Sequence, residues 1–213
     1  MKKQIIFRFI ILKMILAFLG FYWLIQYFLN PYRTLNYFLK AIEQKNIDII
    51  YKLVLEEEKQ YLNKRHIEKL LELMFYRHRS KISAVIFPSP PADRWLEVMV
   101  KWLDGETGQA LVIDGRKILS RIHLFRPPGR WKWQVSFTHF VKDYIYLNIA
   151  PIELYHQGWT EENIKLNHTL YEHCRKNITK RILDQWGIKE TFPLPAKILK
   201  RGKYIVIWKT NQK

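Results

Sequence analysis

The sequence predicts an α+β protein, in which an N-terminal transmembrane helix is followed by helices packed on a curved antiparallel sheet. Three observations lead to this fold class. Apolar residues recur at helical spacing between residues 34 and 77. Between residues 81 and 141 the period changes to the alternation of strands, and short turn sequences separate these runs. Helices and strands are therefore segregated along the chain, as in an α+β fold.

The first thirty residues combine basic and apolar side chains and hold no acid. We expect a single membrane anchor here, because residues 14–29 approach the roughly 20 apolar residues of a spanning helix and Lys13 can snorkel to the headgroups. A cleaved signal peptide is the alternative, but no small-residue cleavage pattern follows the run. The residues expected to form the anchor are Met14, Ile15, Leu16, Phe18, Leu19, Phe21, Tyr22, Trp23, Leu24, Ile25, Phe28 and Leu29.

Basic residues on the two sides of the anchor predict its orientation. Three follow it within twenty residues, and four precede it: Lys2, Lys3, Arg8 and Lys13. Because cytoplasmic segments carry the excess of Lys and Arg, we expect a cytoplasmic N-terminus and an extracytoplasmic body at a cell membrane. The chain then divides into a basic tail with the anchor (1–30), an α+β domain (31–145) and a basic helix–strand extension packed on it (146–213).

Three helices are predicted after the anchor, at residues 34–47, 47–62 and 64–77. Thr34 caps the first of them, and apolar residues recur at helical spacing in each. The second helix contains three successive acids, Glu56, Glu57 and Glu58. We interpret these acids as a solvated face, since adjacent residues do not converge on one side of a helix.

The strands are predicted at residues 81–87, 95–103 and 130–141, with a hairpin at the Asp-Gly pair 114–115. In the second of these strands Leu96 and Val98 lie on one face and Glu97 lies on the other. A helix follows Thr160, which caps it, and ends at Gly187. A final strand is predicted at residues 203–209.

The net charge of +17 is concentrated at the two ends of the chain. Residues 31–164 carry 20 basic and 16 acidic side chains, whereas residues 165–213 carry 12 basic and 3 acidic ones. A basic segment can bind anionic lipid or nucleic acid, or it can solvate a helix face. A nucleic-acid partner is not expected for an extracytoplasmic body. Cys174 is the only cysteine, so the chain forms no intramolecular disulfide.

Two motifs indicate a family. P-x-x-T-x-x-x-F-L-x-A-I-x-x-x-N spans residues 31–46, and W-K-W-Q-V-S-F spans residues 131–137. They resemble the first helix and a late strand of nuclear transport factor 2-like domains, over about residues 31–142. The resemblance implies a strongly curved sheet that wraps its helices into a cone. It also implies a scaffold that hosts enzymes, binding modules and assembly subunits, whose enzymes use Asp, His or Tyr side chains inside the cone.

The strands place a few titratable groups together. Arg121 and His123 alternate on one side of their strand, and His139 and Asp143 follow on the next segment. If these strands pair, His123, His139 and Asp143 are candidates for acid–base catalysis or metal binding. Ordinary strand histidines are the competing interpretation, because this spacing does not force three ligands to converge.

Phosphate-loop, dinucleotide-binding and nucleophile-elbow motifs are absent from the sequence. We therefore expect no cofactor and no metal, and a binding role in preference to catalysis. The leading hypothesis is an accessory or structural protein whose body binds a protein partner of the envelope or a small apolar ligand. Two alternatives stay open: an enzyme that uses acid–base residues inside the cone, and a subunit of an envelope transfer or assembly complex.

Overall fold

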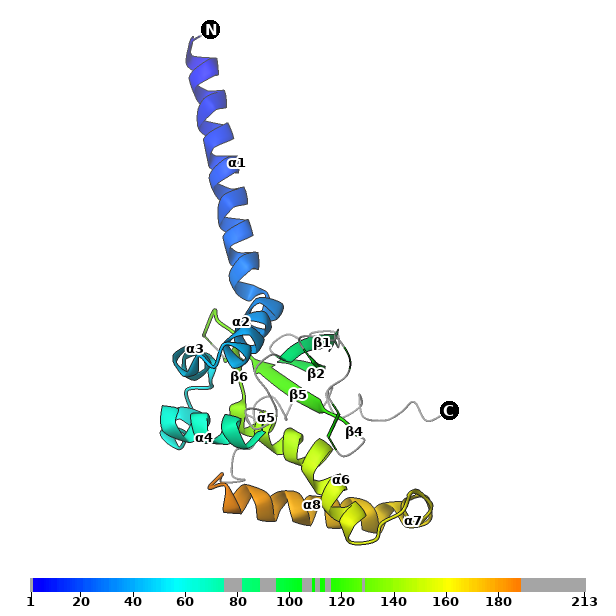
Figure 1. The fold of residues 1–213 in the computed structure, drawn as a ribbon. Helices are drawn as coiled ribbons and strands as arrows, with labels where there is room; N and C mark the ends of the chain where they lie inside the picture. The colour runs from blue at the N-terminus through cyan, green and yellow to red at the C-terminus, as the bar shows by residue number, and fades with distance from the viewer. Residues whose placement is uncertain are drawn as a thin grey trace. The chain divides into compact units, whose positions relative to one another are not determined.

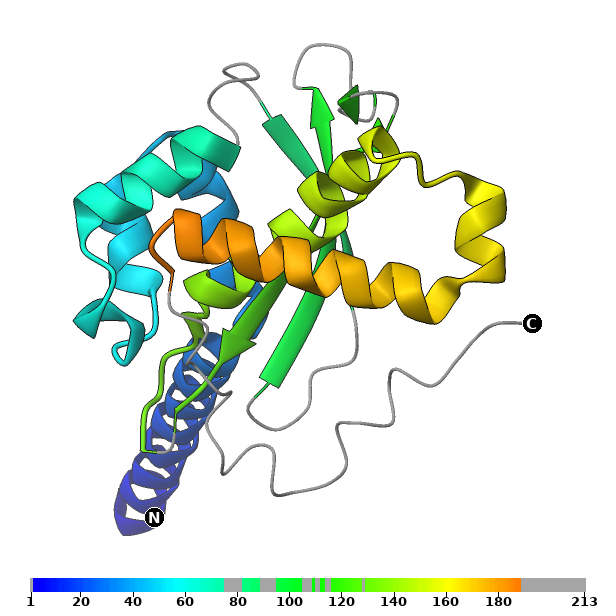
Figure 2. The same cartoon turned by 90° about the horizontal axis from the view of Figure 1, so that it is seen from below.

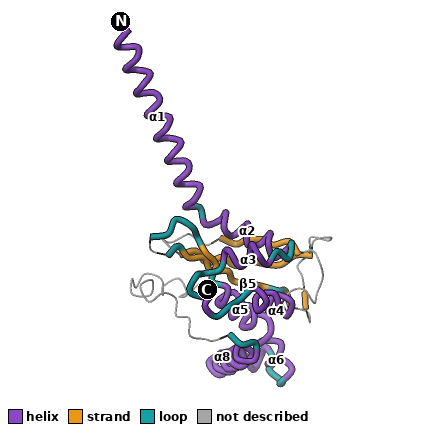
Figure 3. The backbone as a smooth tube through the Cα atoms, turned by 90° about the vertical axis from the view of Figure 1, so that its left-hand side faces the viewer, coloured by secondary structure: helices purple, strands orange, loops and turns teal. Residues whose placement is uncertain are grey.

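The computed structural model describes residues 2–74, 82–88, 95–104, 109, 112–113, 116–127 and 129–188. Contacts between Cα atoms divide the chain into two compact units, Met1–Tyr144 and Ile145–Lys213. Unit 1 joins helices to an antiparallel sheet, and the described residues of unit 2 form helices and turns (Figures 1 and 3). The described chain is therefore α+β.

Helix α1 (Lys2–Leu29) is continuous over 28 residues (Figure 1). The predicted transmembrane anchor is wrong: among the described residues, no helix is both long enough and apolar enough to cross a membrane. Lys13 interrupts the apolar run, and the uncharged stretch of residues 14–29 spans only about 24 Å of helix, against about 30 Å of hydrocarbon. The prediction of a single-pass membrane protein is therefore also wrong. The predicted location at a cell membrane stays a prediction.

Three short helices follow α1 in unit 1: α2 (Pro31–Glu43), α3 (Ile47–Leu53) and α4 (Lys64–Met74). Asn30 caps α2 by accepting a hydrogen bond from the Tyr32 amide at 3.0 Å. The second predicted helix, at residues 47–62, is shorter in the structure. It ends at Leu53 because Val54 leaves the helix to form a parallel bridge with Val135, and a 3₁₀ turn, η1 (Glu58–Gln60), follows.

The main sheet has four antiparallel strands in the order β1 (Ile82–Pro88), β2 (Trp95–Asp104), β5 (Leu119–Phe125) and β6 (Gln134–Val135) (Figure 2). Two further strands, β3 (Val112–Ile113) and β4 (Arg116–Lys117), pair with each other on the two sides of the Asp-Gly pair that predicted a hairpin.

The register of β2 and β5 sorts their side chains between the two faces of the sheet. Leu96, Val98, Val100 and Trp102 are buried on one face of β2. On that same face Trp102 Nε1 donates a hydrogen bond to Ser120 Oγ at 2.7 Å. Glu97 lies directly opposite His123 on the other face. The alternation of β2 is thus the predicted one, but the polar face is covered by helix α5, which contacts β5.

The predicted strand at residues 130–141 is wrong over most of its length. Only Gln134–Val135 is a strand, and helix α5 (Phe137–Tyr144) begins two residues later. Ser136 precedes this helix and its carbonyl accepts the Phe140 amide at 3.1 Å, as an N-cap residue does. Trp133 and Val135 alternate with polar residues, and this alternation predicted a longer strand. It continues into the residues that begin helix α5, so the sequence pattern did not reveal where the strand ends.

Unit 2 contains a π-helical turn, η3 (Ile145–Ile149), followed by α6 (Ala150–His156), α7 (Glu161–Leu166) and α8 (His168–Gln185). The helix predicted after Thr160 is interrupted at Asn167, so it forms α7 and α8. Arg175 of α8 holds η3, because its guanidinium lies 3.7 Å from the Tyr146 ring centroid and donates to the Tyr146 carbonyl at 2.7 Å. The strand predicted at residues 203–209 lies outside the described residues.

Candidate functional site

A group of polar side chains is enclosed between β5, α5 and the 3₁₀ turn η1. We call it the polar cluster, and it consists of Glu58, Glu97, Arg121, His123, Ser136, His139 and Asp143. It contains all three residues that the sequence suggested as acid–base candidates. The structure brings His123, His139 and Asp143 together, although His139 and Asp143 come from a helix and not from the predicted strand.

His123 is the centre of the first half of the polar cluster. Its Nε2 atom lies 2.7 Å from Asp143 Oδ2, which is a charge-assisted hydrogen bond. Its Nδ1 atom lies 3.9 Å from Glu97 Oε2 across the β2–β5 pair. Arg121, two residues earlier on the same face of β5, lies 3.0 Å from Glu97 Oε1 through Nε and 3.9 Å from Asp143 Oδ2. Two carboxylates therefore face one arginine and one histidine.

Ser136 is the centre of the second half. Its hydroxyl donates to Glu58 Oε1 at 2.6 Å, and its Oγ atom lies 2.7 Å from His139 Nδ1. The other Glu58 oxygen accepts the backbone amides of Phe137 at 2.7 Å and Thr138 at 3.3 Å. A carboxyl group from η1 thus satisfies the first amides of α5, at the end where the helix dipole favours negative charge.

The two halves meet at the histidines, whose ring centroids are 5.5 Å apart at an interplanar angle of 61°. Burial raises the pKa of Glu58 to about 7, and the hydrogen bonds from Ser136, Phe137 and Thr138 oppose that rise. Burial, together with the nearby His123, lowers the pKa of His139 to about 4. Near neutral pH His139 is therefore uncharged, and Glu58 is divided between its acid and its carboxylate.

Access to the polar cluster is limited. Glu58 and Ser136 are 1% exposed and His123 is 6% exposed. Glu97, Arg121, His139 and Asp143 are half-buried. Proton sharing along Glu58, Ser136 and His139 is chemically possible in this geometry, but Glu58 and Ser136 are themselves buried from solvent. Within the described part of the chain, no group of three or more His, Cys, Asp or Glu side chains is placed to hold a metal ion. The arrangement is best explained as a structural network.

Sequence reasoning missed Glu58, which it placed on a solvated face with its two neighbours. Glu56 and Glu57 are indeed exposed, whereas Glu58 is buried. The signal that could have found it is its spacing from Leu55 and Leu62, three residues before and four residues after, which are both buried. Glu58 lies at the helical spacing of two core residues.

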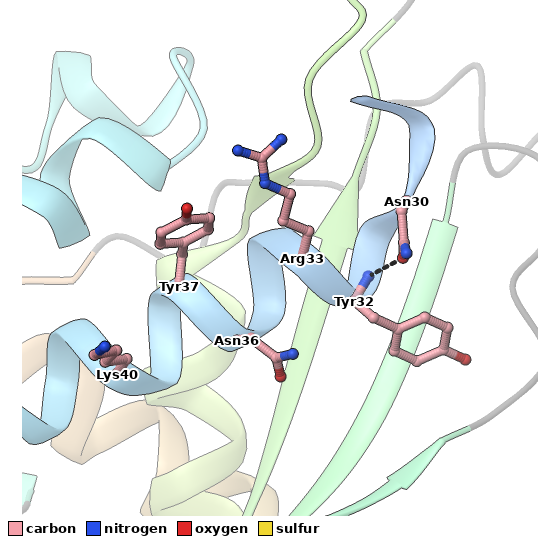
Figure 4. Close-up of a pocket in the computed structure, with 6 residues that line it drawn as sticks. All are labelled: Asn30, Tyr32, Arg33, Asn36, Tyr37 and Lys40. Atoms are coloured by element: carbon pink, nitrogen blue, oxygen red, sulfur yellow. Dashed lines mark hydrogen bonds between the residues drawn. The ribbon is translucent and has the colours of Figure 1, made fainter. Parts of the chain in front are cut away.

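A second candidate site lies on the surface of α2. An open depression of about 430 Å³ is lined by Asn30, Tyr32, Arg33, Asn36, Tyr37 and Lys40 (Figure 4). These side chains come from the N-cap and from one side of the helix, whereas Leu35, Phe38 and Ala41 on the opposite side are buried in the core. The Arg33 guanidinium lies 5.5 Å from the Tyr37 ring centroid. The lining is basic, aromatic and amide-bearing, and none of these six residues is acidic.

Comparison of the chain with protein-family models, with curated proteins and with solved structures finds no match. The resemblance to nuclear transport factor 2-like domains stays a prediction.

Proposed function

We propose that this protein works at a lipid surface, where α1 inserts into lipid and holds unit 1 beside the membrane. The observation that supports this proposal is the exposure of α1 between Ile11 and Leu24. Each described side chain from Ile11 to Leu24 is exposed, including Phe18 and Trp23, of which 74% and 75% of the surface is accessible. Soluble monomers rarely leave an apolar surface of this extent in contact with water.

Lipid is the occupant that fits this surface best. A helix partner covers one apolar stripe and leaves a polar face on the other side of the helix. Closely spaced residues point to different sides of α1, and those at Leu16, Phe18, Leu19 and Phe21 are all exposed. Lipid can cover every side of a helix at once. Insertion from one side of a bilayer is sufficient, and α1 is not required to cross it.

Charge supports the same occupant. Four basic residues and no acid precede the apolar run of α1. Basic residues next to an inserted segment are attracted to anionic headgroups, by about 1 kcal/mol for each residue near the surface. The role that follows is an accessory one: a tethered body meets other membrane proteins at a raised effective concentration without additional contacts.

Vesicle flotation of the full-length protein tests this proposal. The protein is diluted from mild detergent onto phosphatidylcholine vesicles, and a variant carries Leu16→Gln, Phe18→Gln and Trp23→Gln. Burying each of these side chains contributes about 1.5–3 kcal/mol, so we expect the partition coefficient to fall by at least about a hundredfold. Glutamine is a good helix former, so α1 itself should persist.

A matched control removes three exposed apolar side chains from elsewhere, through Trp131→Gln, Tyr155→Gln and Leu166→Gln. This control should float as the wild type does. The proposal is wrong if the wild-type protein does not bind vesicles, or if the α1 variant and the control lose binding equally. An α1-dependent dimer that persists in excess lipid would also contradict it, and would identify a second copy as the occupant.

A further inference from the structure

We propose that the depression on α2 binds the phosphate of an anionic phospholipid headgroup. This inference rests on the proposed function, because it requires α1 to bring the start of α2 to a lipid surface. The site is formed by side chains that share one side of a short helix, at residues 32, 33, 36, 37 and 40, together with Asn30 before it (Figure 4).

The chemistry of the lining fits a phosphate. Arg33 and Lys40 are basic side chains, and a guanidinium presents its donors in a fork that matches two phosphate oxygens. The amide groups of Asn30 and Asn36 supply further neutral donors at the rim. A carboxylate at this position would repel an anion, and α2 carries its single acid, Glu43, at its last residue.

The competing interpretation is an ordinary solvated helix face. Such faces usually mix both signs of charge, since interspersed charges keep a surface soluble without a strong local field. Here the outer side of α2 combines two cations with two tyrosines and lacks an acid over its first three turns. Arg33 also lies close to the Tyr37 ring, with 5.5 Å between its guanidinium carbon and the ring centroid, which is a cation–π contact within the lining.

The position of the depression selects a lipid phosphate over a free one. Leu29 is the last residue of α1 and Pro31 is the first residue of α2, so the site begins at Asn30, directly after the apolar helix. Trp133 Nε1 donates to the Leu29 carbonyl at 2.6 Å, which fixes this junction to the body of unit 1. When α1 is buried in lipid, the next residues lie at the level of the headgroups, where Tyr, Arg and Lys are favoured.

The test compares binding of full-length protein to phosphatidylcholine vesicles with binding to vesicles that contain 30% phosphatidylglycerol, in 0.1 M salt. Arg33→Gln combined with Lys40→Gln should reduce the affinity for the anionic vesicles by roughly thirtyfold, since each basic residue near the surface contributes about fivefold. Affinity for pure phosphatidylcholine should change much less. The basic N-terminal tail is intact in both proteins, so its contribution cancels in the comparison.

Two further variants separate a specific site from general charge. Lys176→Gln combined with Lys180→Gln removes the same charge from exposed positions of α8 and should leave the anionic preference unchanged. Arg33→Lys preserves the charge but loses the fork, and should weaken anionic binding severalfold. Equal losses in the α2 and α8 double variants would overturn the site and leave a general charge effect.

Inorganic phosphate is the remaining arm of the test. Added at constant ionic strength, it should compete only weakly with the vesicles, because a free ion lacks the contribution of α1. Strong competition by inorganic phosphate, with no preference for anionic vesicles, would overturn the lipid assignment in favour of free phosphate. Retained binding to phosphatidylcholine without any anionic preference would overturn the headgroup site alone, whereas loss of binding to all vesicles would contradict the proposed function itself.

Discussion

Helix α1 and the polar cluster depart from ordinary burial in opposite directions. The helix exposes apolar side chains on all sides, and the polar cluster encloses charged and titratable groups between a sheet and a helix. Buried polar groups are tolerated when they are hydrogen-bonded, and Glu58, Ser136 and the His123–Asp143 pair make such bonds within unit 1. Apolar side chains on different sides of a single helix cannot shield one another from water. Polar groups of the cluster thus bind one another within unit 1, whereas we propose that α1 is covered by lipid from outside the chain.

The largest test of this contrast removes the acid that joins the cluster. Glu58→Ala leaves the amides of Phe137 and Thr138 and the hydroxyl of Ser136 without their buried acceptor. We expect the free energy of unfolding at pH 6 to fall by about 3 kcal/mol, because each unsatisfied buried donor costs about 1–3 kcal/mol and water can restore part of the loss. Urea denaturation followed by circular dichroism measures this change.

Glu57→Ala is the matched control for that measurement. Glu57 is adjacent in sequence and exposed, so its loss should change the unfolding free energy by no more than about 0.5 kcal/mol. Equal effects of the two substitutions would show that the cluster does not depend on Glu58. The α1 glutamine variant extends the comparison, since it should abolish lipid binding and leave the unfolding free energy of the body unchanged.

A smaller net effect should appear in the pH dependence of wild-type stability, because Glu58 and His139 act in opposite directions. The pKa of Glu58 rises in the fold from 4.5 to about 7, so its contribution to stability is complete below pH 4.5 and is lost as the pH rises to 7. The pKa of His139 falls from 6.5 to about 4, so its contribution is present above pH 6.5 and is lost as the pH falls to 4. Each corresponds to about 3 kcal/mol.

Between pH 4.5 and 6.5 these two contributions should largely cancel, and single substitutions should separate them. Glu58→Gln should leave a protein that loses stability as the pH falls from 6.5 to 4. His139→Asn should leave one that loses stability as the pH rises from 4.5 to 7. Urea midpoints measured at half-unit intervals of pH provide the test. Parallel profiles for the two variants would show that neither group is perturbed by burial.

The parts of the fold that were predictable from sequence are those with one dominant period. The helical spacing of Leu35, Phe38 and Ile42 located α2, and the alternation of β2 located both its faces. The start of α5 was not predictable in this way. The carboxyl group that satisfies its first amides comes from Glu58, 79 positions away from Phe137, and no local pattern records a contact at that separation.

The candidate sites show the same limit. A shared face of β5 correctly grouped Arg121 with His123, because alternation is a local property. Glu97 was placed on the face opposite Leu96 and Val98, but the sequence does not record that a later helix covers that face. The apolar run in α1 can be read directly from the sequence, but the transmembrane anchor predicted from it was wrong. The number of apolar residues in this run is near the lower limit for a spanning helix. Whether it reaches that limit depends on whether the flanking Lys13 is counted as part of the span.

The smallest predicted effect concerns the one described hydrogen bond between the end of α1 and the strand region of unit 1. Trp133→Phe removes the donor to the Leu29 carbonyl and part of a buried ring, and should lower the unfolding free energy by about 1–2 kcal/mol. Trp131→Phe, at a position that is 60% exposed, should change it by less than about 0.5 kcal/mol. In vesicle flotation the two variants should differ little, because the apolar surface of α1 is intact in both. If Trp133→Phe weakened lipid binding as strongly as the α1 glutamine variant does, insertion of α1 into lipid would depend on its contact with the rest of unit 1. Helix α1 and the body of unit 1 would then form one energetic unit.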